Sequence, residues 1–466
     1  MIKFFNTLSG RLEPFHSLKR GEVRLYTCGP TVYDYAHIGN FRAYIFEDLL
    51  KRFLIFMGYK VIHVMNITDV DDKTIKGAKA LGVNLQQYTK KYIDAFFEDI
   101  KVLNISRADY YPRATEHITD IVQMIKGLLR KGYAYKKNGS IYFDISKFPR
   151  YGQLSKIKLD KLKPGKRVEA DEYAKERVQD FALWKEKKEG EPSWPTEIGN
   201  GRPGWHIECS VMSTKYLGFT FDIHCGGVDN IFPHHENEIA QSEAYSGQKF
   251  VNYWLHCHHL IVEGEKMSKS KGNFFTLRDL LQKEIEPMAL RFLLLSTHYR
   301  KMLNFTFEAL HQAEASLQRI RDFLYELEKS SFPSGENEQV GKLMEETRQK
   351  FTESLSDDLN ISEALAALFE LIRQANVLIK QNKILREDAR KLISFIHSLD
   401  LVLAVLPQEK EESLPPEILK KIKEREKARQ KKNYQLADKI RQELKEQGII
   451  LEDTKDGVRW KRTRRK

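Results

Sequence analysis

The sequence predicts an α/β protein in which an insert divides a parallel sheet, followed by a helical bundle and a small α+β domain. Three observations lead to this expectation. Residues 23–66 follow the order strand, turn, helix, strand, which is a βαβ unit. A strand pattern and a glycine pair return at residues 219–227, after a stretch of different composition. From residue 305 onward the apolar residues repeat with helical spacing.

The βαβ unit begins with a short buried strand at residues 23–27, which runs into the turn Cys28-Gly29-Pro30. A helical pattern follows from about residue 40 to 57, and a second strand is predicted at residues 61–66. Parallel strands of this kind bind ligands at their carboxyl ends. Neither a G-x-G-x-x-G nor a Walker A sequence occurs, so the turn has no standard dinucleotide or P-loop signature.

The insert is richer in Lys, Gly and Pro and runs from about residue 132 to 204. The second half of the sheet then begins with a strand near residues 219–225. A helix is predicted at residues 232–244, and a strand at residues 254–262 leads into a lysine-rich loop.

Residues 305–406 have a helical pattern that breaks near residues 332–335, which predicts a bundle. After residue 416 one basic helix is expected to run to about Gln447, and Gly448 would end it. The apolar segments at residues 449–451 and 458–460 then predict a small hairpin.

Composition narrows the function classes. The chain has 466 residues and a net charge of +12, and no apolar run reaches the ~18–20 residues of a membrane span. No signal-peptide pattern is present, so we expect a cytoplasmic protein. Residues 420–466 hold 18 basic and 8 acidic residues, a net charge of +10. So basic an end predicts a polyanionic partner. A solubilising tail is the simpler alternative.

Two separated segments indicate phosphate chemistry. Lys266-Met267-Ser268-Lys269-Ser270 lies between Gly264 and Gly272 and would form a mobile, cationic loop. Alone, such a loop is more often a solvated run of charge. Far upstream, Ala36-His37-Ile38-Gly39-Asn40 lies where a strand end meets a helix start, and backbone N–H groups there favour phosphate.

A metal site is suggested by His234 and Glu238, which are four residues apart and share one helix face. Two further ligands must come from distant segments. The four cysteines are too few for a disulfide framework, which favours thiol chemistry or metal binding. The spacing leaves several candidate ligands open: Cys28, Cys209, His224, Cys225, Cys257, His258 and His259.

The paired segments resemble the HIGH and KMSKS motifs of class I aminoacyl-tRNA synthetases, and the surrounding residues resemble the cysteinyl-tRNA synthetase family. The resemblance implies a Rossmann-like sheet, an insert too short for an editing domain, and a C-terminal anticodon-binding domain. It also implies that L-cysteine is activated with ATP and passed to the 3′-terminal adenosine of cysteine tRNA. The resemblance further implies one Zn²⁺ ion per subunit and Mg²⁺ bound with ATP. It also implies a monomeric chain.

The resemblance assigns roles by position. Catalytic roles fall to His37, Lys266 and Lys269. ATP binding falls to His37, Gly39, Asn40, Gly226, Asp229 and Lys269. The metal ligands would be Cys28, Cys209, His234 and Glu238, and the cysteine pocket would include Cys28, Thr68 and Trp205. Arg459 and Trp460 would contact tRNA. Two positions depart from the family pattern: Asn40 replaces the second histidine of HIGH, and Lys271 replaces an apolar residue after KMSKS.

Six regions are expected along the chain. They are a first catalytic half (1–125), an inserted domain (126–200), a second catalytic half (201–260), the lysine loop and stem-contact region (261–310), the helical bundle (311–408) and the anticodon-binding domain (409–466).

Two other functions fit parts of the sequence. One is a cysteine ligase of the same fold that acts on a small amine and lacks the RNA domain. The other is a non-catalytic RNA-binding paralogue.

Overall fold

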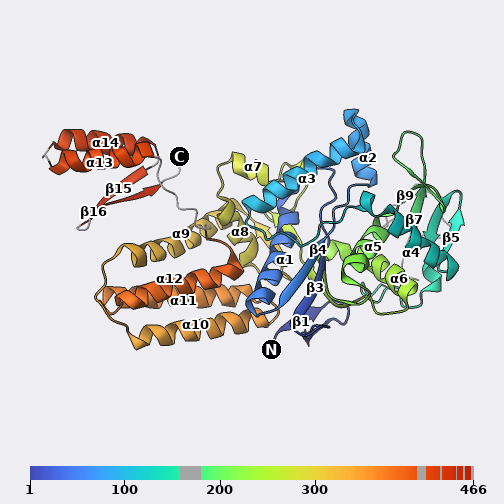
Figure 1. Cartoon of the computed structure of the whole chain (residues 1–466), viewed down its shortest axis with the longest axis horizontal. Helices are drawn as coiled ribbons and strands as arrows, with labels where there is room; N and C mark the ends of the chain where they lie inside the picture. Colours follow the sequence, from blue (N-terminus) through green and yellow to red (C-terminus); the bar gives the residue numbers. More distant parts are fainter. Residues whose placement is uncertain (158–179, 407–415, 431–432, 448, 455–456, 463–466) are drawn as a thin grey trace. The chain divides into compact units, whose positions relative to one another are not determined.

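The computed structural model describes residues 1–157, 180–406, 416–430, 433–447, 449–454 and 457–462. The chain forms two compact units, Met1–Leu406 and Pro407–Lys466, which we call unit 1 and unit 2 (Figure 1). No helix within these described ranges is long and apolar enough to cross a membrane.

The centre of unit 1 is a four-stranded parallel sheet with the strand order β11-β10-β3-β4. Its strands are β3 (Glu22–Thr27), β4 (Lys60–Met65), β10 (Phe221–Gly227) and β11 (Val251–Cys257). The first two strands precede the insert and the last two follow it, so the divided parallel sheet predicted from the sequence is confirmed. The carboxyl ends of β3 and β10 lie side by side, with Thr27 paired to Cys225.

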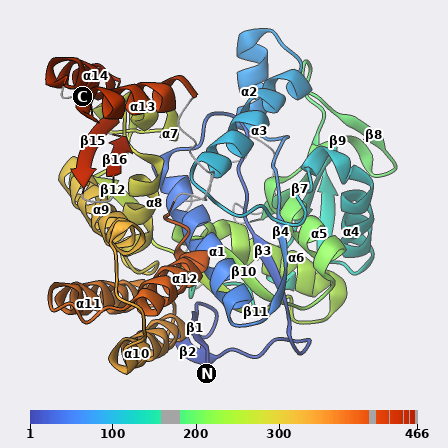
Figure 2. The same ribbon diagram turned by 60° about the vertical axis from the view of Figure 1, so that its left-hand side comes forward.

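Helix α1 (Ile38–Phe56) connects β3 to β4 and packs along the sheet (Figure 2). Phe41, Ile45 and Phe53 recur at helical spacing and are completely buried against the core. The helix begins two residues earlier than the periodicity predicted. The reason is a reciprocal cap in which His37 and Asn40 satisfy each other's backbone N–H groups.

The insert forms a five-stranded antiparallel sheet with the order β5-β6-β7-β9-β8. Its strands are β5 (Ala134–Lys137), β6 (Ser140–Phe143), β7 (Phe181–Glu186), β8 (Trp194–Thr196) and β9 (Gly199–Pro203). Helix α4 (Ile118–Arg130) precedes this sheet and α5 (Trp205–Leu217) leads back to the parallel sheet. The segment before α4 also contains β1 (Lys3–Asn6), β2 (Arg11–Pro14), α2 (Asp72–Leu81) and α3 (Leu85–Val102).

Two elements near the lysine loop differ from the prediction. The single strand expected at residues 254–262 is two strands, because β11 ends at Cys257 and β12 (Leu260–Val262) belongs to another sheet. At the bend His258 N donates to Tyr299 O, which turns the chain away from the parallel sheet. The helix expected to start at residue 232 is regular only as α6 (Glu236–Ser246), since Phe232 has extended backbone angles.

The remaining elements of unit 1 are mainly helical. β12 pairs with β13 (Glu265–Lys266) and β14 (Leu303–Phe305), and α7 (Leu277–Gln282) and α8 (Pro287–Ser296) lie between these strands in sequence. Four helices follow: α9 (Phe307–Lys329), α10 (Glu338–Ser356), α11 (Ile361–Lys380) and α12 (Arg386–Leu403). The break predicted near residues 332–335 falls between α9 and α10.

Unit 2 corrects one further prediction. The single basic helix is two helices, α13 (Pro416–Gln430) and α14 (Tyr434–Glu446), because Asn433 caps a new helix through the N–H of Leu436. Gly448, which was expected to end it, lies outside the described residues. The predicted hairpin is present as β15 (Ile449–Thr454) and β16 (Gly457–Arg462). β16 contains Arg459 and Trp460, whose side chains lie outside the described part of the chain.

Candidate active site and metal cluster

Cys28 directly follows β3, at the carboxyl edge of the parallel sheet. The next residue must be glycine, because a Cβ atom at Gly29 would lie 1.8 Å from the backbone oxygen of Asn66. Gly29 N also donates to Asn66 Oδ1 at 2.9 Å. This close contact holds the end of β3 against the segment after β4 and places the Cys28 thiol at the sheet edge.

The four proposed metal ligands come together in this structure. The Sγ atoms of Cys28 and Cys209 and one ligand atom each of His234 and Glu238 all lie within 4.8 Å of one another. His234 Nε2 is 3.1 Å from Glu238 Oε1. The segments from which they come are the turn after β3, α5, the turn before α6, and α6. Glu238 Oε1 is buried and the contact with His234 is too poorly aligned to count as a hydrogen bond, so a cation between the two groups would satisfy it better.

The charges within the cluster depend on one another. Hydrogen bonding between the two thiols lowers the pKa of Cys209 to about 6 and raises the pKa of Cys28. Burial opposes a charged imidazole at His234, yet the neighbouring Glu238 and Cys209 raise its pKa to about 10. Burial likewise opposes ionisation of Glu238. The neighbouring His224 and His234 outweigh this effect and lower the pKa of Glu238 to about 2. The cluster therefore favours an ionised thiol and carboxylate, the forms that bind metal.

The competing ligand candidates fall into two classes. His224 lies at the cluster, where its Nε2 is 3.0 Å from Glu238 Oε2. Cys225 and Cys257 are buried in the apolar core and belong to neither group of potential metal ligands found among the described residues, and the same is true of His258 and His259.

His235 is not among the ligands predicted from the sequence, although its Nε2 lies 3.2 Å from Cys28 Sγ. The available signal was its spacing of three residues from Glu238, which also places two side chains on one helix face.

Thr68 and Trp205, expected in the cysteine pocket, lie on either side of this region. The Trp205 ring stacks on His234 with ring centroids 4.1 Å apart. Thr68 is buried, and its hydroxyl accepts from Asn66 Nδ2 at 3.1 Å. Its backbone N–H donates to Pro30 O, so Thr68 is held beside the Cys28 turn.

The segment that resembles HIGH forms the start of α1. His37 Nδ1 accepts from Asn40 N at 3.2 Å, and Asn40 Oδ1 accepts from His37 N at 3.0 Å. Asn40 therefore stabilises the helix start through its carboxamide. A Cβ atom at Gly39 would lie 3.0 Å from the His37 ring, so glycine keeps this surface flat.

Gly226 and Asp229 lie at and just after the end of β10. A Cβ atom at Gly226 would lie 2.8 Å from the His235 ring, which explains the glycine. Burial lowers the pKa of His37, whereas the charge of Asp229 opposes this shift. Asp229 therefore lies close enough to His37 for its charge to affect the pKa of that imidazole.

The lysine loop, residues 264–272, lies next to the start of α1. Ile38 N donates to Phe275 O at 3.0 Å, just after the loop. Lys269 Nζ pairs with Asp34 Oδ2 at 2.6 Å, whereas the additional Lys271 pairs with Glu265 Oε2 at 2.8 Å. Lys266 is exposed at the end of β13. The two signature segments are therefore neighbours.

Three family models match this chain. Residues 14–315 match the catalytic domain of tRNA synthetases class I (C), residues 350–407 match the DALR domain, and residues 411–460 match the cysteinyl-tRNA ligase anticodon binding domain.

Full-length relatives are similar throughout. The chain is 50% identical over 468 residues to a cysteine–tRNA ligase of Protochlamydia amoebophila (strain UWE25), covering 99% of this chain and 98% of the relative. It is 50% identical over 472 residues to a cysteine–tRNA ligase of Brachyspira hyodysenteriae (strain ATCC 49526 / WA1), covering 99% of each.

Solved structures support the fold. Mycobacterium tuberculosis methionyl-tRNA synthetase in complex with methionyl-adenylate matches with a TM-score of 0.60 and 16% identity, covering 82% of this chain and 90% of that one. The ternary complex of Agrobacterium radiobacter K84 agnB2 LeuRS with tRNA and LeuAMS matches with a TM-score of 0.61 and 12% identity, covering 84% and 85%. With three family models and full-length relatives in agreement, the chain belongs to the cysteine–tRNA ligase family of class I aminoacyl-tRNA synthetases.

Proposed function

We propose that this protein activates L-cysteine with ATP to give cysteinyl-adenylate and pyrophosphate, and transfers the cysteinyl group to the 3′-terminal adenosine of cysteine tRNA. One observation supports the proposal: a group of sulfur, imidazole and carboxylate atoms that could hold a metal follows the carboxyl ends of the parallel strands, where α1 also begins and Lys269 pairs with Asp34.

ATP would bind at the N-terminus of α1. The helix dipole there favours the phosphates, with His37, Gly39 and Asn40 forming this surface. Gly226 and Asp229 would face the nucleoside, where the Asp229 carboxylate can accept from ribose hydroxyls. Mg²⁺ would accompany the phosphates.

Lys266 and Lys269 would stabilise the pyrophosphate leaving group. Negative charge grows on that group as the bond to the α-phosphate breaks, so a positioned ammonium contributes most in the transition state. Since the Lys269 side chain is 67% exposed in its pair with Asp34, little desolvation opposes its transfer to a phosphate.

The metal-binding residues would be Cys28, Cys209, His234 and Glu238, and we propose one Zn²⁺ ion per chain. Two sulfurs, one imidazole and one carboxylate, whose ligand atoms all lie within 4.8 Å of one another, fit this ion. When bound, zinc supplies a Lewis acid that prefers a thiolate sulfur to a hydroxyl oxygen. That preference would separate cysteine from serine, which an apolar pocket alone separates by only ~10²-fold.

The cysteine pocket would lie between the cluster and α1, with Thr68 and Trp205 as its walls. The Trp205 ring is stacked on His234, which places an apolar surface directly beside the metal ligands. Thr68, fixed by Asn66 and by the Pro30 carbonyl, would limit the size of the accepted side chain.

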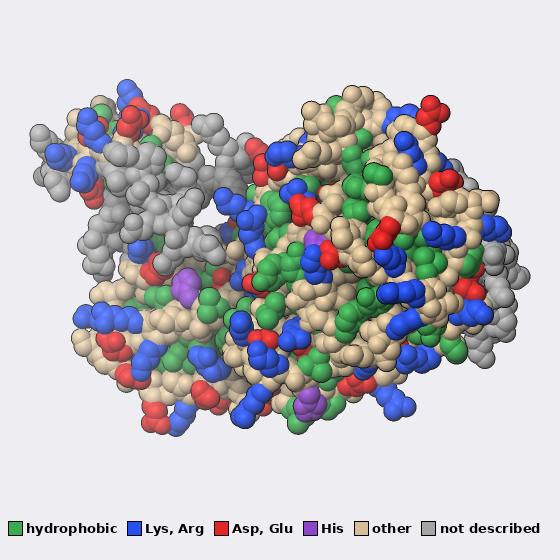
Figure 3. Space-filling view, turned by 45° about the vertical axis from the view of Figure 1, so that its right-hand side comes forward, with side chains coloured by type: hydrophobic (Ala, Val, Ile, Leu, Met, Phe, Trp, Pro, Cys, Tyr) green, Lys and Arg blue, Asp and Glu red, His purple; other side chains and the backbone are tan. Residues whose placement is uncertain are grey.

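tRNA binding is proposed for unit 2 and for the basic surface of unit 1. Figure 3 shows lysine and arginine side chains distributed over one face of unit 1, with acidic side chains among them. Arg459 and Trp460 of β16 are proposed to contact unpaired tRNA bases or phosphates. The resemblance to the anticodon binding domain disfavours a ligase that acts on a small amine.

The decisive experiment is ATP–pyrophosphate exchange with cysteine and with serine, followed by aminoacylation of cysteine tRNA. Cysteine should support exchange and serine should fall short by more than ~10²-fold. Charging of the tRNA should follow. Exchange without charging would favour the small-amine ligase, and absence of exchange would favour the RNA-binding paralogue.

A further inference from the structure

We propose that the cluster contains two overlapping sites for one divalent transition-metal ion. The first site consists of Cys28, Cys209, His234 and Glu238. The second site consists of Cys28, His224, His235 and Glu238, whose ligand atoms also lie within 4.8 Å of one another. The inference rests on the proposed function only in taking Cys28 and Glu238 to bind metal, and the second site lies outside that function.

The distances in the second site suit a tetrahedral ion. Cys28 Sγ lies 3.2 Å from His235 Nε2, and His224 Nε2 lies 3.0 Å from Glu238 Oε2. His235 Nε2 lies 3.9 Å from Glu238 Oε1. Metal bonds of about 2.0–2.3 Å in a tetrahedron separate the ligand atoms by about 3.3–3.8 Å. An ion could therefore enter with shifts of a few tenths of an ångström.

The imidazoles of the second site are also oriented as metal ligands are. The Nδ1 of a ligating histidine usually contacts a carbonyl, another polar side chain or water, which fixes the ring. His224 Nδ1 lies 3.2 Å from Cys225 O. His235 Nδ1 lies 2.8 Å from His256 Nε2, and His256 Nδ1 lies 2.8 Å from Thr7 Oγ1. Both Nε2 atoms are thereby directed at the cluster.

The two sites differ in chemistry and in what lies beside them. The ligands exclusive to each site are buried in both cases, since His224 and His235 are completely buried and Cys209 and His234 are 1% and 2% exposed. Its one sulfur, two imidazoles and one carboxylate fit Zn²⁺ or Co²⁺. The first site instead contains His234, against which Trp205 of the proposed cysteine pocket stacks. An ion in the second site is therefore withdrawn from the amino acid.

Because the sites share Cys28 and Glu238, one ion occupies one site at a time. The exclusive ligands of the first site, Cys209 and His234, determine which is filled. Losing either of them moves the ion into the second site, where it is retained and the enzyme is inactive. The second site thus keeps the metal in the protein when the first is incomplete.

The test uses the full-length double variant Cys209→Ala/His234→Ala, which lacks both exclusive ligands of the first site. It is loaded with Co²⁺ or Zn²⁺ and desalted, and the bound metal is measured. We expect one ion per chain, absorption from a single thiolate at roughly half the wild-type intensity per cobalt, and two imidazoles by X-ray absorption spectroscopy. A folded variant that binds no metal overturns the proposal.

Controls separate this result from misfolding. Cys28→Ala/Glu238→Gln removes both shared ligands and should bind no metal, whereas Cys257→Ala, a buried thiol outside both sites, should retain the two-thiolate spectrum. If the first double variant does not fold by circular dichroism, Cys209→Ala alone decides: two imidazoles support the second site, and one imidazole overturns it. Cysteine-dependent exchange by the wild type is measured separately, so a failure of the proposed function is distinguishable.

Discussion

Lys269 Nζ and Asp34 Oδ2 lie 2.6 Å apart, so an ion pair joins the lysine loop to the turn before α1. The same ammonium lies over the Phe274 ring, whose edge meets the His37 ring. Asp34 is thus the negatively charged partner of Lys269, the lysine that is proposed to bind pyrophosphate.

Asp34→Asn should therefore lower the KM for ATP. The carboxylate competes with the phosphates for Lys269, and an exposed pair of this kind contributes at most about 1 kcal/mol, or roughly a fivefold change. Steady-state exchange kinetics at varied ATP would measure it. Glu265→Gln, which removes the more exposed partner of Lys271, is the control and should leave this KM unchanged. A higher KM in Asp34→Asn would mean that the pair positions the loop for ATP.

Cys209→Ser should abolish cysteine activation. Loss of residues that merely support metal ligands costs about 10–100-fold in activity, so loss of a ligand should cost more than about 100-fold in cysteine-dependent exchange. The matched control is Cys257→Ala, a buried thiol outside the cluster, which should retain exchange. Retained exchange in Cys209→Ser would remove Cys209 from the ligand set.

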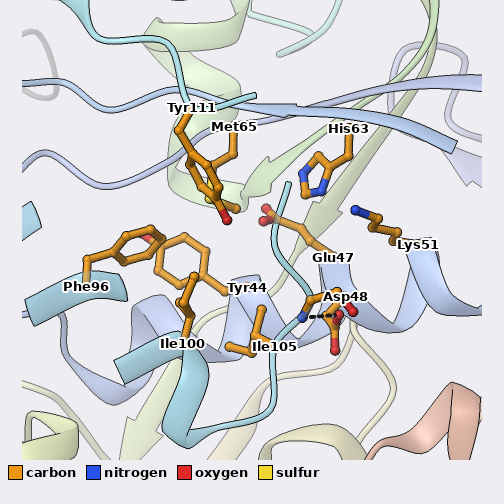
Figure 4. Close-up of a pocket in the computed structure, with 11 residues that line it drawn as sticks. Tyr44, Glu47, Asp48, Lys51, His63, Met65, Phe96, Ile100, Ile105 and Tyr111 are labelled. Atoms are coloured by element: carbon orange, nitrogen blue, oxygen red, sulfur yellow. Dashed lines mark hydrogen bonds between the residues drawn. The ribbon is translucent and has the colours of Figure 1, made fainter. Parts of the chain in front are cut away.

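Glu47→Gln should make the protein progressively more stable than wild type as the pH rises. Glu47 points into a cavity with about 10 Å³ of free space, toward the rings of His63 and Tyr111 (Figure 4), and neither carboxylate oxygen has a hydrogen-bond partner in the described chain. Burial raises its pKa well above the usual 4.5. The folded protein therefore keeps a proton that the unfolded chain releases above pH 4.5, and stability falls by up to about 1.4 kcal/mol per pH unit until the folded pKa is reached.

Glutamine cannot ionise and removes this dependence. Thermal unfolding of the variant and the wild type at pH 5 and pH 8 would measure the difference. The exposed Glu346→Gln serves as control and should follow the wild type at both pH values. If the midpoint of thermal unfolding changed equally in Glu47→Gln and in the wild type between the two pH values, Glu47 would have an ordinary pKa.

Arg291→Met should destabilise unit 1. Arg291 and Asp48 are completely buried with Nη2 and Oδ2 2.6 Å apart, and Arg291 also donates to the carbonyls of Leu403 and Leu103. Removing one partner of a buried pair costs up to about 3–5 kcal/mol, and here Asp48 keeps Arg52 Nε at 2.8 Å, so we expect a loss at or below the lower end of that range. Denaturant unfolding would measure this cost. Arg373→Met, at an exposed pair with Glu370, should unfold like wild type.

Local patterns were sufficient to predict the parallel sheet and the pairing of His234 with Glu238. Strand and helix periodicities are short-range properties, and two residues four apart on a helix face are neighbours in any fold. Cys28 and Cys209 are different, because their contact depends on how α5 packs against the end of β3. Only family resemblance could join them before the structure was known.

The other differences have both distant and local causes. The strand expected at residues 254–262 is divided by a hydrogen bond from His258 to Tyr299, a contact between distant segments. The sequence predicts one helix where unit 2 has two, because the helical pattern continues through their connection and does not reveal the cap at Asn433. Asn40 could be recognised as a departure from the family, but its role in capping α1 required coordinates.

The division between β11 and β12 has a mechanical consequence. The four proposed metal ligands belong to the large parallel sheet and its helices, whereas the lysine loop is attached to the small sheet of β12, β13 and β14. A displacement of the loop would change the small sheet and the contacts of the loop with Asp34 and α1. The proposed metal ligands would keep their positions during such a displacement, so that loop movement and metal binding depend on separate parts of the fold.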